Sequence, residues 1–200
     1  MIWDKVSPLY DFFETLINRR VYTGTGTRVA AYISEQDHVL ECACGTGAIS
    51  VPVARKCKTL TATDTAEGML RQTSKKCSRF GNVKVRRADL MHLKYKDNLF
   101  DKVIAGNVIH LLDNPEAALK ELLRVCKPGG RVIIPNYINK EEKNLKTIIR
   151  LLEMIGVRFK RQFNLSTYKQ FFADAGYPEA EFDIVEGRMS CAIAVIQKCK

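Results

Sequence analysis

Residues 38–47, His-Val-Leu-Glu-Cys-Ala-Cys-Gly-Thr-Gly, decide the fold of this chain. They comprise an apolar run typical of a β-strand, an acidic residue, and a tight loop that contains Gly45 and Gly47. The segment that follows, residues 48–55, begins like a helix. Glycine lets a backbone come close to a ligand, and the first turn of a helix presents unpaired N–H groups to an anion. The order of strand, glycine loop and helix therefore predicts a site for a charged ligand.

Asp64 follows the second predicted strand, residues 59–63. In α/β proteins that bind nucleosides, an acidic residue at the tip of the second strand binds both hydroxyls of the ribose. The glycines fit the dinucleotide-binding fingerprint only in part, because Ser50 stands where its third glycine or alanine belongs. Taken alone, this glycine pattern is more typical of an ordinary turn between a strand and a helix.

The composition indicates one globular domain. The chain has 200 residues, of which 46% are apolar and 27% charged, which suits a single buried core and argues against disorder. No apolar run approaches the ~20 residues of a membrane-spanning helix. The first residues lack the pattern of a signal peptide. We therefore expect a cytoplasmic protein.

The seven cysteines are expected to be free thiols, since nothing in the sequence indicates secretion. Cys42 and Cys44 could suggest a metal, but no second pair of cysteines or histidines stands at ligand spacing nearby. Both stand where a strand meets the glycine loop, and small residues fit there. We expect no bound metal.

The formal net charge is +10, and basic residues gather in two segments, 71–87 and 140–161. A basic surface can attract nucleic acid or anionic lipid, although it is more often a solvated face. No interleaved aromatic residues accompany either segment, which argues against nucleic acid as a partner. Peripheral contact with an anionic membrane stays open, and the sequence does not indicate an oligomeric state.

Strands and helices alternate along the chain. Apolar or alternating stretches predict strands at 38–42, 59–63, 83–87, 101–106 and 131–135. Helical spacing predicts helices at 47–56, 66–78 and 115–126. This alternation predicts a Rossmann-like α/β fold with a doubly wound, mostly parallel sheet, which binds ligands beyond its C-terminal strand ends.

The last part of the chain departs from this alternation. Residues 181–185 and 191–196 predict two strands joined by a short turn that contains Gly187. They add a C-terminal antiparallel hairpin and bring the expected sheet to seven strands. The common dehydrogenase pattern has no such hairpin.

We expect a single domain over residues 1–200, with an N-terminal helical cap at 1–36 and a helical insert at 139–165 over the substrate site. Residues 139–156 place an apolar stripe and a basic side at helical spacing. A helix packed on the domain explains this pattern as well as a lid over the substrate does. A face that rests on an anionic membrane is a further alternative.

Five motifs stand in a characteristic order: Trp-Asp-Lys-Val-Ser-Pro-Leu-Tyr-Asp at 3–11, Val-Leu-Glu-Cys-Ala-Cys-Gly-Thr-Gly at 39–47, Arg-Ala-Asp-Leu at 87–90, Phe-Asp-Lys-Val-Ile at 100–104, and Leu-Leu-Arg-Val-Cys-Lys-Pro-Gly-Gly at 122–130. With them the chain resembles the class I S-adenosylmethionine-dependent methyltransferases over nearly its whole length. It is most similar to the small-molecule and lipid branch. That branch includes the ubiquinone and menaquinone C-methyltransferases and the bacterial phospholipid N-methyltransferases.

The resemblance implies that S-adenosylmethionine is bound at the C-terminal strand ends, under a tyrosine of the N-terminal cap. Glu41 and the loop after it would bind the methionine end, Asp64 the ribose hydroxyls, and Asp89 the adenine amino group. The implied cofactor-binding residues are Tyr10, Glu41, Ala43, Cys44, Gly45, Gly47, Asp64, Thr65, Met69, Ala88, Asp89, Leu90, Asn107 and Val108.

The sequence departs from the usual family pattern in two places. Glu41 replaces the more usual aspartate, and Ala43 replaces the first glycine of the loop. The end of the fourth strand, Ala105 to Val108, also lacks the Asn/Asp-Pro-Pro-aromatic signature of enzymes that methylate exocyclic or amide nitrogens. Nucleic-acid bases and glutamine are therefore less expected as targets.

Methyl transfer from a sulfonium needs mainly positioning. Because the leaving group is already good, the protein holds the acceptor in line with the methyl group and excludes water, which can contribute on the order of 7–11 kcal/mol. A general base is needed only for an acceptor that arrives protonated. The resemblance places His110 near the transferred methyl group, and histidine titrates near neutrality. His110 is therefore the candidate base, with packing at a helix start as the alternative.

Methyl transfer to a small-molecule or lipid-like acceptor is the leading hypothesis for function. A catalytically silent module that binds S-adenosylmethionine and an NAD-dependent oxidoreductase are the alternatives. The missing third glycine and the hairpin count against the oxidoreductase. The sequence does not specify whether nitrogen, oxygen, sulfur or carbon attacks the methyl group.

Overall fold

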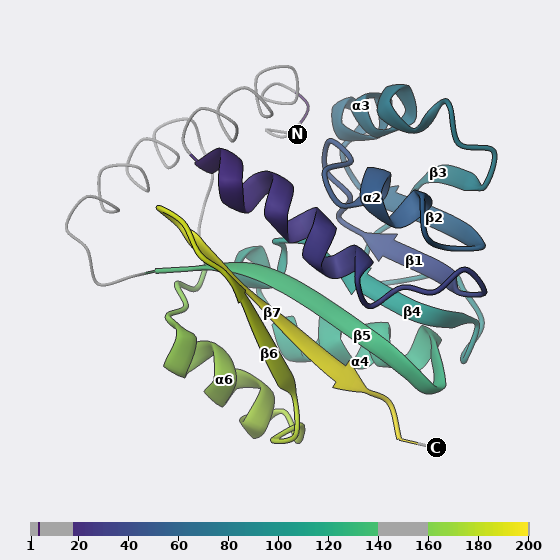
Figure 1. The fold of residues 1–200 in the computed structure, drawn as a ribbon. Coiled ribbons are helices and arrows are strands. Elements are labelled where there is room, and N and C mark those ends of the chain that lie inside the picture. The colour runs from purple at the N-terminus through teal and green to yellow at the C-terminus, as the bar shows by residue number, and fades with distance from the viewer. Residues whose placement is uncertain (1–3, 5–17, 140–159, 200) are drawn as a thin grey trace.

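The computed structural model describes Asp4, residues 18–139 and residues 160–199. Tyr10 and most of the predicted insert, residues 140–159, lie outside the described residues. The described chain forms one twisted sheet with helices on both of its faces (Figure 1). This architecture confirms the predicted α/β fold.

Seven strands make the sheet, in the order β3-β2-β1-β4-β5-β7-β6. All neighbouring strands are parallel except β7, which is antiparallel to both β5 and β6. The predicted C-terminal hairpin is therefore confirmed. The strands are β1 (His38–Cys42), β2 (Thr59–Asp64), β3 (Val83–Arg87), β4 (Phe100–Ala105), β5 (Cys126–Ile138), β6 (Glu181–Val185) and β7 (Ser190–Gln197).

Strand β5 begins five residues before the predicted start at 131. Residues 127–130, Lys-Pro-Gly-Gly, lie within it rather than in a turn outside the sheet. The register against β4 shifts at this point, between Phe100 and Lys102. Gly130 is required there, because a Cβ would stand 2.7 Å from the carbonyl oxygen of Asp101. The two glycines thus form an irregularity in the strand.

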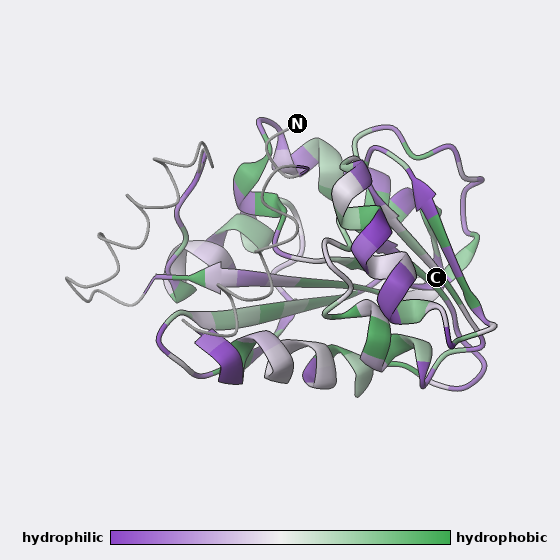
Figure 2. Ribbon diagram, turned by 90° about the horizontal axis from the view of Figure 1, so that it is seen from above, coloured by the Kyte–Doolittle hydropathy of each residue, from purple (hydrophilic) through white to green (hydrophobic). Residues whose placement is uncertain are grey.

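Two hydrophobic layers hold the helices to the sheet. On one face, the N-terminal helix (helical over residues 18–30), α2 (Ser50–Ala54) and α3 (Glu67–Cys77) pack on the strands through Val21, Val53 and Leu70. On the other face lie the 3-10 turn η1 (Ile109–Leu111), α4 (Pro115–Val125) and α6 (Leu165–Asp174). Seen from above, hydrophobic residues colour much of the strands, and hydrophilic residues recur along the helices (Figure 2).

Helix α4 follows its sequence signals closely. Asn114 caps its first turn by accepting a hydrogen bond from the N–H of Ala117, and Pro115 occupies the first turn. Leu119 and Leu122 are fully buried against the sheet. The helix ends at Val125, one residue before the predicted end.

Helix α6 was not predicted. Its start carries a capping box, in which the side chains of Asn164 and Thr167 each accept a hydrogen bond from the backbone N–H of the other residue. Tyr168, Phe171 and Phe172 are buried on its inner side. The capping pair followed by aromatic residues at a spacing of three and four residues was the signal that could have found it.

The N-terminal helix packs closely against the C-terminal hairpin. The side chain of Asn18 donates to the carbonyl of Met189 at 2.7 Å. Gly187, in the turn between β6 and β7, lies so close that a Cβ would overlap Cγ2 of Val21. The N-terminal helix and the last strands are thereby joined beside the C-terminal end of β5.

Candidate functional site

The glycine loop connects β1 to α2 through a run of left-handed backbone. Ala43, Gly45 and Gly47 have φ angles of 53°, 54° and 86°. Gly47 is further constrained, because a Cβ would stand 3.1 Å from Oγ1 of Thr73 on α3. Ala43 adopts this conformation without being glycine, at a cost of about 1–2 kcal/mol. Such strain at a loop beside a cavity is typical of a binding site.

The carboxylate of Asp64, at the end of β2, faces this loop. Its Oδ2 accepts a hydrogen bond from the N–H of Gly45 at 2.9 Å, and its Oδ1 accepts from the N–H of Ala66 at 2.9 Å. Burial raises the pKa of Asp64, the N–H donors oppose that rise, and the charge of Asp4 adds to it. The two backbone donors fix the orientation of the carboxylate and leave further lone pairs for a ligand.

Glu41 is the most deeply buried acid of the site. It is 1% exposed, and Oγ of Ser50 donates to its Oε2 at 2.6 Å. Burial raises its pKa to about 8, the hydrogen bond from Ser50 opposes the rise, and Asp64 adds to it. Ser50, in the position of the third fingerprint glycine, thus holds a buried acid. The sequence pattern had marked Ser50 only as a departure from that fingerprint.

A small cavity of about 60 Å³ lies between the glycine loop, the N-terminal helix and the ends of β4 and β5. This volume suits about two water molecules or the end of an amino-acid chain. The hydroxyl of Tyr22 lies 3.0 Å from that of Thr46 in its wall. The cavity is lined by Tyr22, Thr25, Glu41, Ala43, Cys44, Gly45, Thr46, Ala48, Ile49, Gly106, Asn107 and Tyr137.

Thr25 marks this cavity as a place for a polar ligand. The residue is 4% exposed, and its Oγ1 is the one buried side-chain oxygen or nitrogen of the described residues that has no hydrogen-bond partner. A buried hydroxyl without a partner costs about 1–3 kcal/mol. A polar group in the cavity would remove that cost. Sequence reasoning missed Thr25, because a threonine within a helix carries no signal of its own.

The residues expected at the adenine end lie at the ends of β2 and β3. Thr65, Ala88 and Asp89 line the wall of a second, larger groove. Asp89 is half exposed and accepts a hydrogen bond from the N–H of Met91. Met69 and Leu90 are buried and do not line this groove.

Asn107 links the end of β4 to β5. Its backbone is left-handed, with φ 49°. Its N–H donates to the carbonyl of Pro135, and its Oδ1 accepts from the N–H of Tyr137 at 2.9 Å. Val108 follows it directly and is half-buried at the start of η1. The structure therefore brings Asn107, but not Val108, to the small cavity.

His110 lies in η1 and is 8% exposed. Its Nδ1 lies 2.6 Å from Oδ1 of Asn136, and Nδ2 of Asn136 donates to the carbonyl of Tyr137. Because a carbonyl oxygen only accepts, this second bond fixes the orientation of the Asn136 amide. Nδ1 of His110 must then carry the proton, which leaves the lone pair on Nε2. Burial lowers the pKa of His110, so its ring is neutral near pH 7.

Comparison with known proteins identifies the family. The chain matches the family model described as a methyltransferase domain over residues 40–134. It is 30% identical to the demethylmenaquinone methyltransferase of Thermobifida fusca over 169 residues, which cover 82% of this chain and 71% of that protein. The chain belongs to the class I S-adenosylmethionine-dependent methyltransferases. The methyltransferase uses S-adenosylmethionine as its cofactor, and this assignment sets aside the nicotinamide oxidoreductase.

Other relatives agree with this assignment. The methyltransferase is 28% identical to the phosphatidylethanolamine N-methyltransferase of Cereibacter sphaeroides, with 80% of this chain and 77% of that protein covered. A solved methyltransferase structure from Thermotoga maritima shares the fold, with a TM-score of 0.73 at 21% identity over 98% of each chain.

Neither a membrane span nor a metal centre is found in the described part of the methyltransferase. None of its described helices is both long and apolar enough to cross a bilayer. Its described histidines, cysteines and acids form no group of three that could bind a metal ion. Cys42 and Cys44 are buried, and all seven cysteines are free thiols.

Proposed function

We propose that this methyltransferase methylates a small, hydrophobic acceptor of the quinone or lipid type. The relatives named above act on demethylmenaquinone and on phosphatidylethanolamine, two acceptors that share long apolar chains. The observation that supports methyl transfer is the site around Asp64, where a partly buried and oriented carboxylate faces a strained glycine loop. The acceptor class is proposed from the relatives.

The residues around the small cavity have the chemistry to hold the methionine end of the cofactor. Glu41 offers a carboxylate to a positively charged amino group, and such a charge would favour its ionised form. The hydroxyl of Thr25, which has no hydrogen-bond partner among the described residues, would find one in the amino-acid tail. Asp64 would bind the ribose hydroxyls, while Thr65 and Asp89 would flank the adenine. Tyr10 and Val108 stay proposals from the family resemblance.

When bound, S-adenosylmethionine supplies an activated methyl group that is displaced in line by the acceptor. The contribution of this chain is to orient the acceptor and to exclude water. For an acceptor that arrives protonated, Nε2 of His110 carries the ring lone pair and is the group that would take the proton. His110 does not line the small cavity. A role in catalysis therefore requires the acceptor to approach from the side of η1.

The remaining expectations are part of the same proposal. Residues 1–200 would act as one domain, with the 139–165 insert covering the acceptor. Its basic side would contact an anionic membrane surface, from which an apolar acceptor could enter the site. The compartment would be the cytoplasm.

Methyl transfer from labelled cofactor tests the acceptor class. Purified full-length protein would be incubated with methyl-labelled S-adenosylmethionine and, separately, with demethylmenaquinone, phosphatidylethanolamine and histamine as a polar amine. We expect label in an apolar product and none in histamine, and Asp64→Ala should abolish the transfer. Turnover confined to the polar amine would refute the proposal, and absence of transfer to any acceptor would favour a silent binding module.

A further inference from the structure

One part of the sheet lacks a covering helix. The connection between β3 and β4, residues 88–99, is described completely and contains no helix. On the far side of the same strands, Leu60 and Ala62 are buried in the layer that includes Leu70 of α3. The side chains that alternate with them on β2, those of Thr59 and Thr61, lie on the uncovered face and border a groove.

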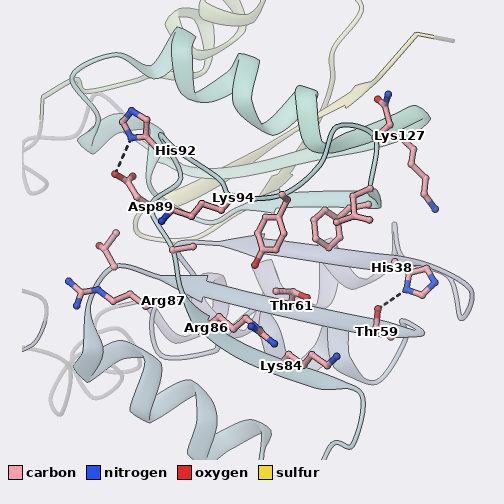
Figure 3. A pocket seen from close by; sticks show the side chains of 16 residues that line it. His38, Thr59, Thr61, Lys84, Arg86, Arg87, Asp89, His92, Lys94 and Lys127 are labelled. Carbon is pink, nitrogen blue, oxygen red and sulfur yellow. Dashed lines mark hydrogen bonds and ion pairs between the residues drawn. The ribbon is translucent and has the colours of Figure 1, made fainter.

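This is the larger groove described above, whose end at Thr65, Ala88 and Asp89 is proposed for the adenine; it is concave and encloses about 1160 Å³. The outer strands β2 and β3 form its floor, and the 88–99 connection forms the opposite wall (Figure 3). Lys84 and Arg86 are exposed and stand on the same side of β3, about 7 Å apart along the strand. Lys94 approaches from the opposite wall (Figure 3). We call this hollow, with Lys84, Arg86, Arg87 and Lys94, the basic groove.

The four cations of the basic groove are not neutralised by the described part of the chain. No ion pair with another described residue is formed by Lys84, Arg86, Arg87 or Lys94. Asp89 is the one acid among the described residues that line this groove, and its carboxylate lies 3.5 Å from Nδ1 of His92. Asp101 lies outside the lining and pairs with Lys127 at 2.6 Å. A concave surface on which charges of one sign predominate concentrates counter-ions.

We propose that the basic groove binds a small anion that carries two or more phosphate groups. Arginine matches the geometry of phosphate oxygens through paired N–H donors, and lysine adds a point charge. The hydroxyl of Thr61, on the floor between these side chains and half-buried, offers an additional donor. Several cations spread over the floor and the facing wall suit an extended polyphosphate better than a single phosphate.

Two macromolecular occupants fit the groove less well. The flat plane of lipid headgroups would reach the rim of a concave surface but not Thr61 on its floor. Single-stranded nucleic acid is bound largely by stacking of bases on exposed aromatic rings. Phe100 is only 6% exposed, and its ring packs edge-on against that of Tyr95 at 5.2 Å. Phe100 therefore offers no stacking platform, and the partly buried ring of Tyr95 alone does not make a row of rings for successive bases.

Calorimetry with inorganic tripolyphosphate tests the proposal on the full chain. Lys84→Ala with Arg86→Ala removes two groove charges. The matched control, Arg71→Ala with Lys75→Ala, removes two exposed charges from α3 on the opposite face. We expect saturable binding to the wild type and the control, and at least tenfold weaker binding to the groove variant. Binding of S-adenosylhomocysteine to each protein reports separately on folding and on the cofactor site.

Several outcomes would overturn the proposal. One is the absence of saturable tripolyphosphate binding to the wild type. Another is an equal loss of tripolyphosphate affinity in the groove variant and in the control variant. Tighter binding of a single-stranded oligonucleotide or of phosphatidylglycerol vesicles, dependent on Lys84 and Arg86, would assign the groove to another partner. If the double variant fails to bind S-adenosylhomocysteine, Lys94→Gln on the facing wall replaces it, with the same expected direction. Because the readout is direct binding, failure of this test leaves the proposed methyl transfer untouched.

Discussion

Gly45 and Asp64 are joined by a hydrogen bond of 2.9 Å, from the backbone N–H of the loop to Oδ2 of the carboxylate. The bond connects the two motifs on which the predicted site depends, the glycine loop after β1 and the acid at the end of β2. The same carboxylate accepts from Ala66 at the start of α3. The shape of the loop and the orientation of the Asp64 carboxylate therefore depend on each other.

Replacement of Asp64 should lower the affinity for the cofactor. Asp64→Ala removes the charged acceptor of the Gly45 N–H and of the proposed ribose contact, so we expect affinity for S-adenosylmethionine to fall by about 100-fold or more, measured by calorimetry. Asp64→Asn keeps one acceptor oxygen, so its affinity for S-adenosylmethionine should lie between those of the wild type and of Asp64→Ala. The control is Glu67→Ala, the next acid along the chain, on the first turn of α3. Wild-type affinity in Asp64→Ala would contradict the assignment.

Glu41→Gln should stabilise the cofactor-free protein and weaken cofactor binding. Since burial raises the pKa of Glu41 to about 8, the folded state retains a proton that the unfolded state loses above its ordinary value of about 4.5. Stability of the wild type therefore falls as pH rises through this window. Glutamine still accepts from Ser50, so the variant should gain roughly 1–3 kcal/mol at pH 8 and almost nothing at pH 4.5. Urea unfolding across this pH range measures the gain, and a gain that is independent of pH would argue against a buried, titrating carboxyl as its cause.

Asn136 should determine which ring nitrogen of His110 carries the proton. Nitrogen NMR of the wild type should show a neutral ring with the proton on Nδ1. Asn136→Leu removes the acceptor, so both neutral tautomers should become populated. If His110 acts as a base, methyl transfer should slow roughly tenfold or more, while cofactor affinity stays unchanged. A wild-type ring protonated on Nε2 would refute this arrangement.

Arg124 holds the 88–99 connection to α4. Its guanidinium donates to the carbonyls of Leu93 and Tyr95, at 2.9 and 2.8 Å, and pairs with Glu121 and Asp97. Arg124→Leu leaves those partners without a donor and should destabilise the protein by about 1–3 kcal/mol in thermal or urea unfolding. Lys120→Leu, at an exposed position of the same helix, is the control and should change stability little. Equal effects of both variants would show that the contacts of Arg124 do not matter.

Gly187→Ala should disturb the contact between the N-terminal helix and the hairpin. The added methyl group would overlap Val21 and stand 3.0 Å from Oδ1 of Asn18. We expect a loss of about 1–3 kcal/mol, measured by thermal unfolding. Gly81→Ala is the control, because nothing lies within 4 Å of its Cβ position. Unchanged thermal stability of Gly187→Ala would show that the N-terminal helix shifts without a cost in free energy.

The sequence predicted the sheet well because its signals are local. β1 and β3 were predicted with their observed bounds, and Asn114 and Pro115 mark the start of α4. The predicted start of β5 was wrong, because Pro128 and Gly129 favour a turn unless a neighbouring strand holds them in the sheet. The pairs on either side of them, Phe100 with Cys126 and Lys102 with Arg131, hold these residues in the sheet as a bulge.

The site was predictable only where a motif carries it. Asp64 and the loop containing Gly45 lie together as the motifs indicated. The partners that orient the site escaped prediction, since they come from residues that are distant in sequence. Asn136 lies 26 positions from His110, and no periodicity or spacing reveals such a pair.

The position of β7 has a consequence for synthesis of the chain. This strand comes last in sequence among the seven, yet it lies between β5 and β6 and is the only neighbour that β6 has. Until Ser190–Gln197 has left the ribosome, β5 presents an open edge along eight paired positions, and β6 has nothing to join. The half of the sheet next to the predicted acceptor side would thus assemble late, and an interrupted chain would expose an edge prone to aggregation.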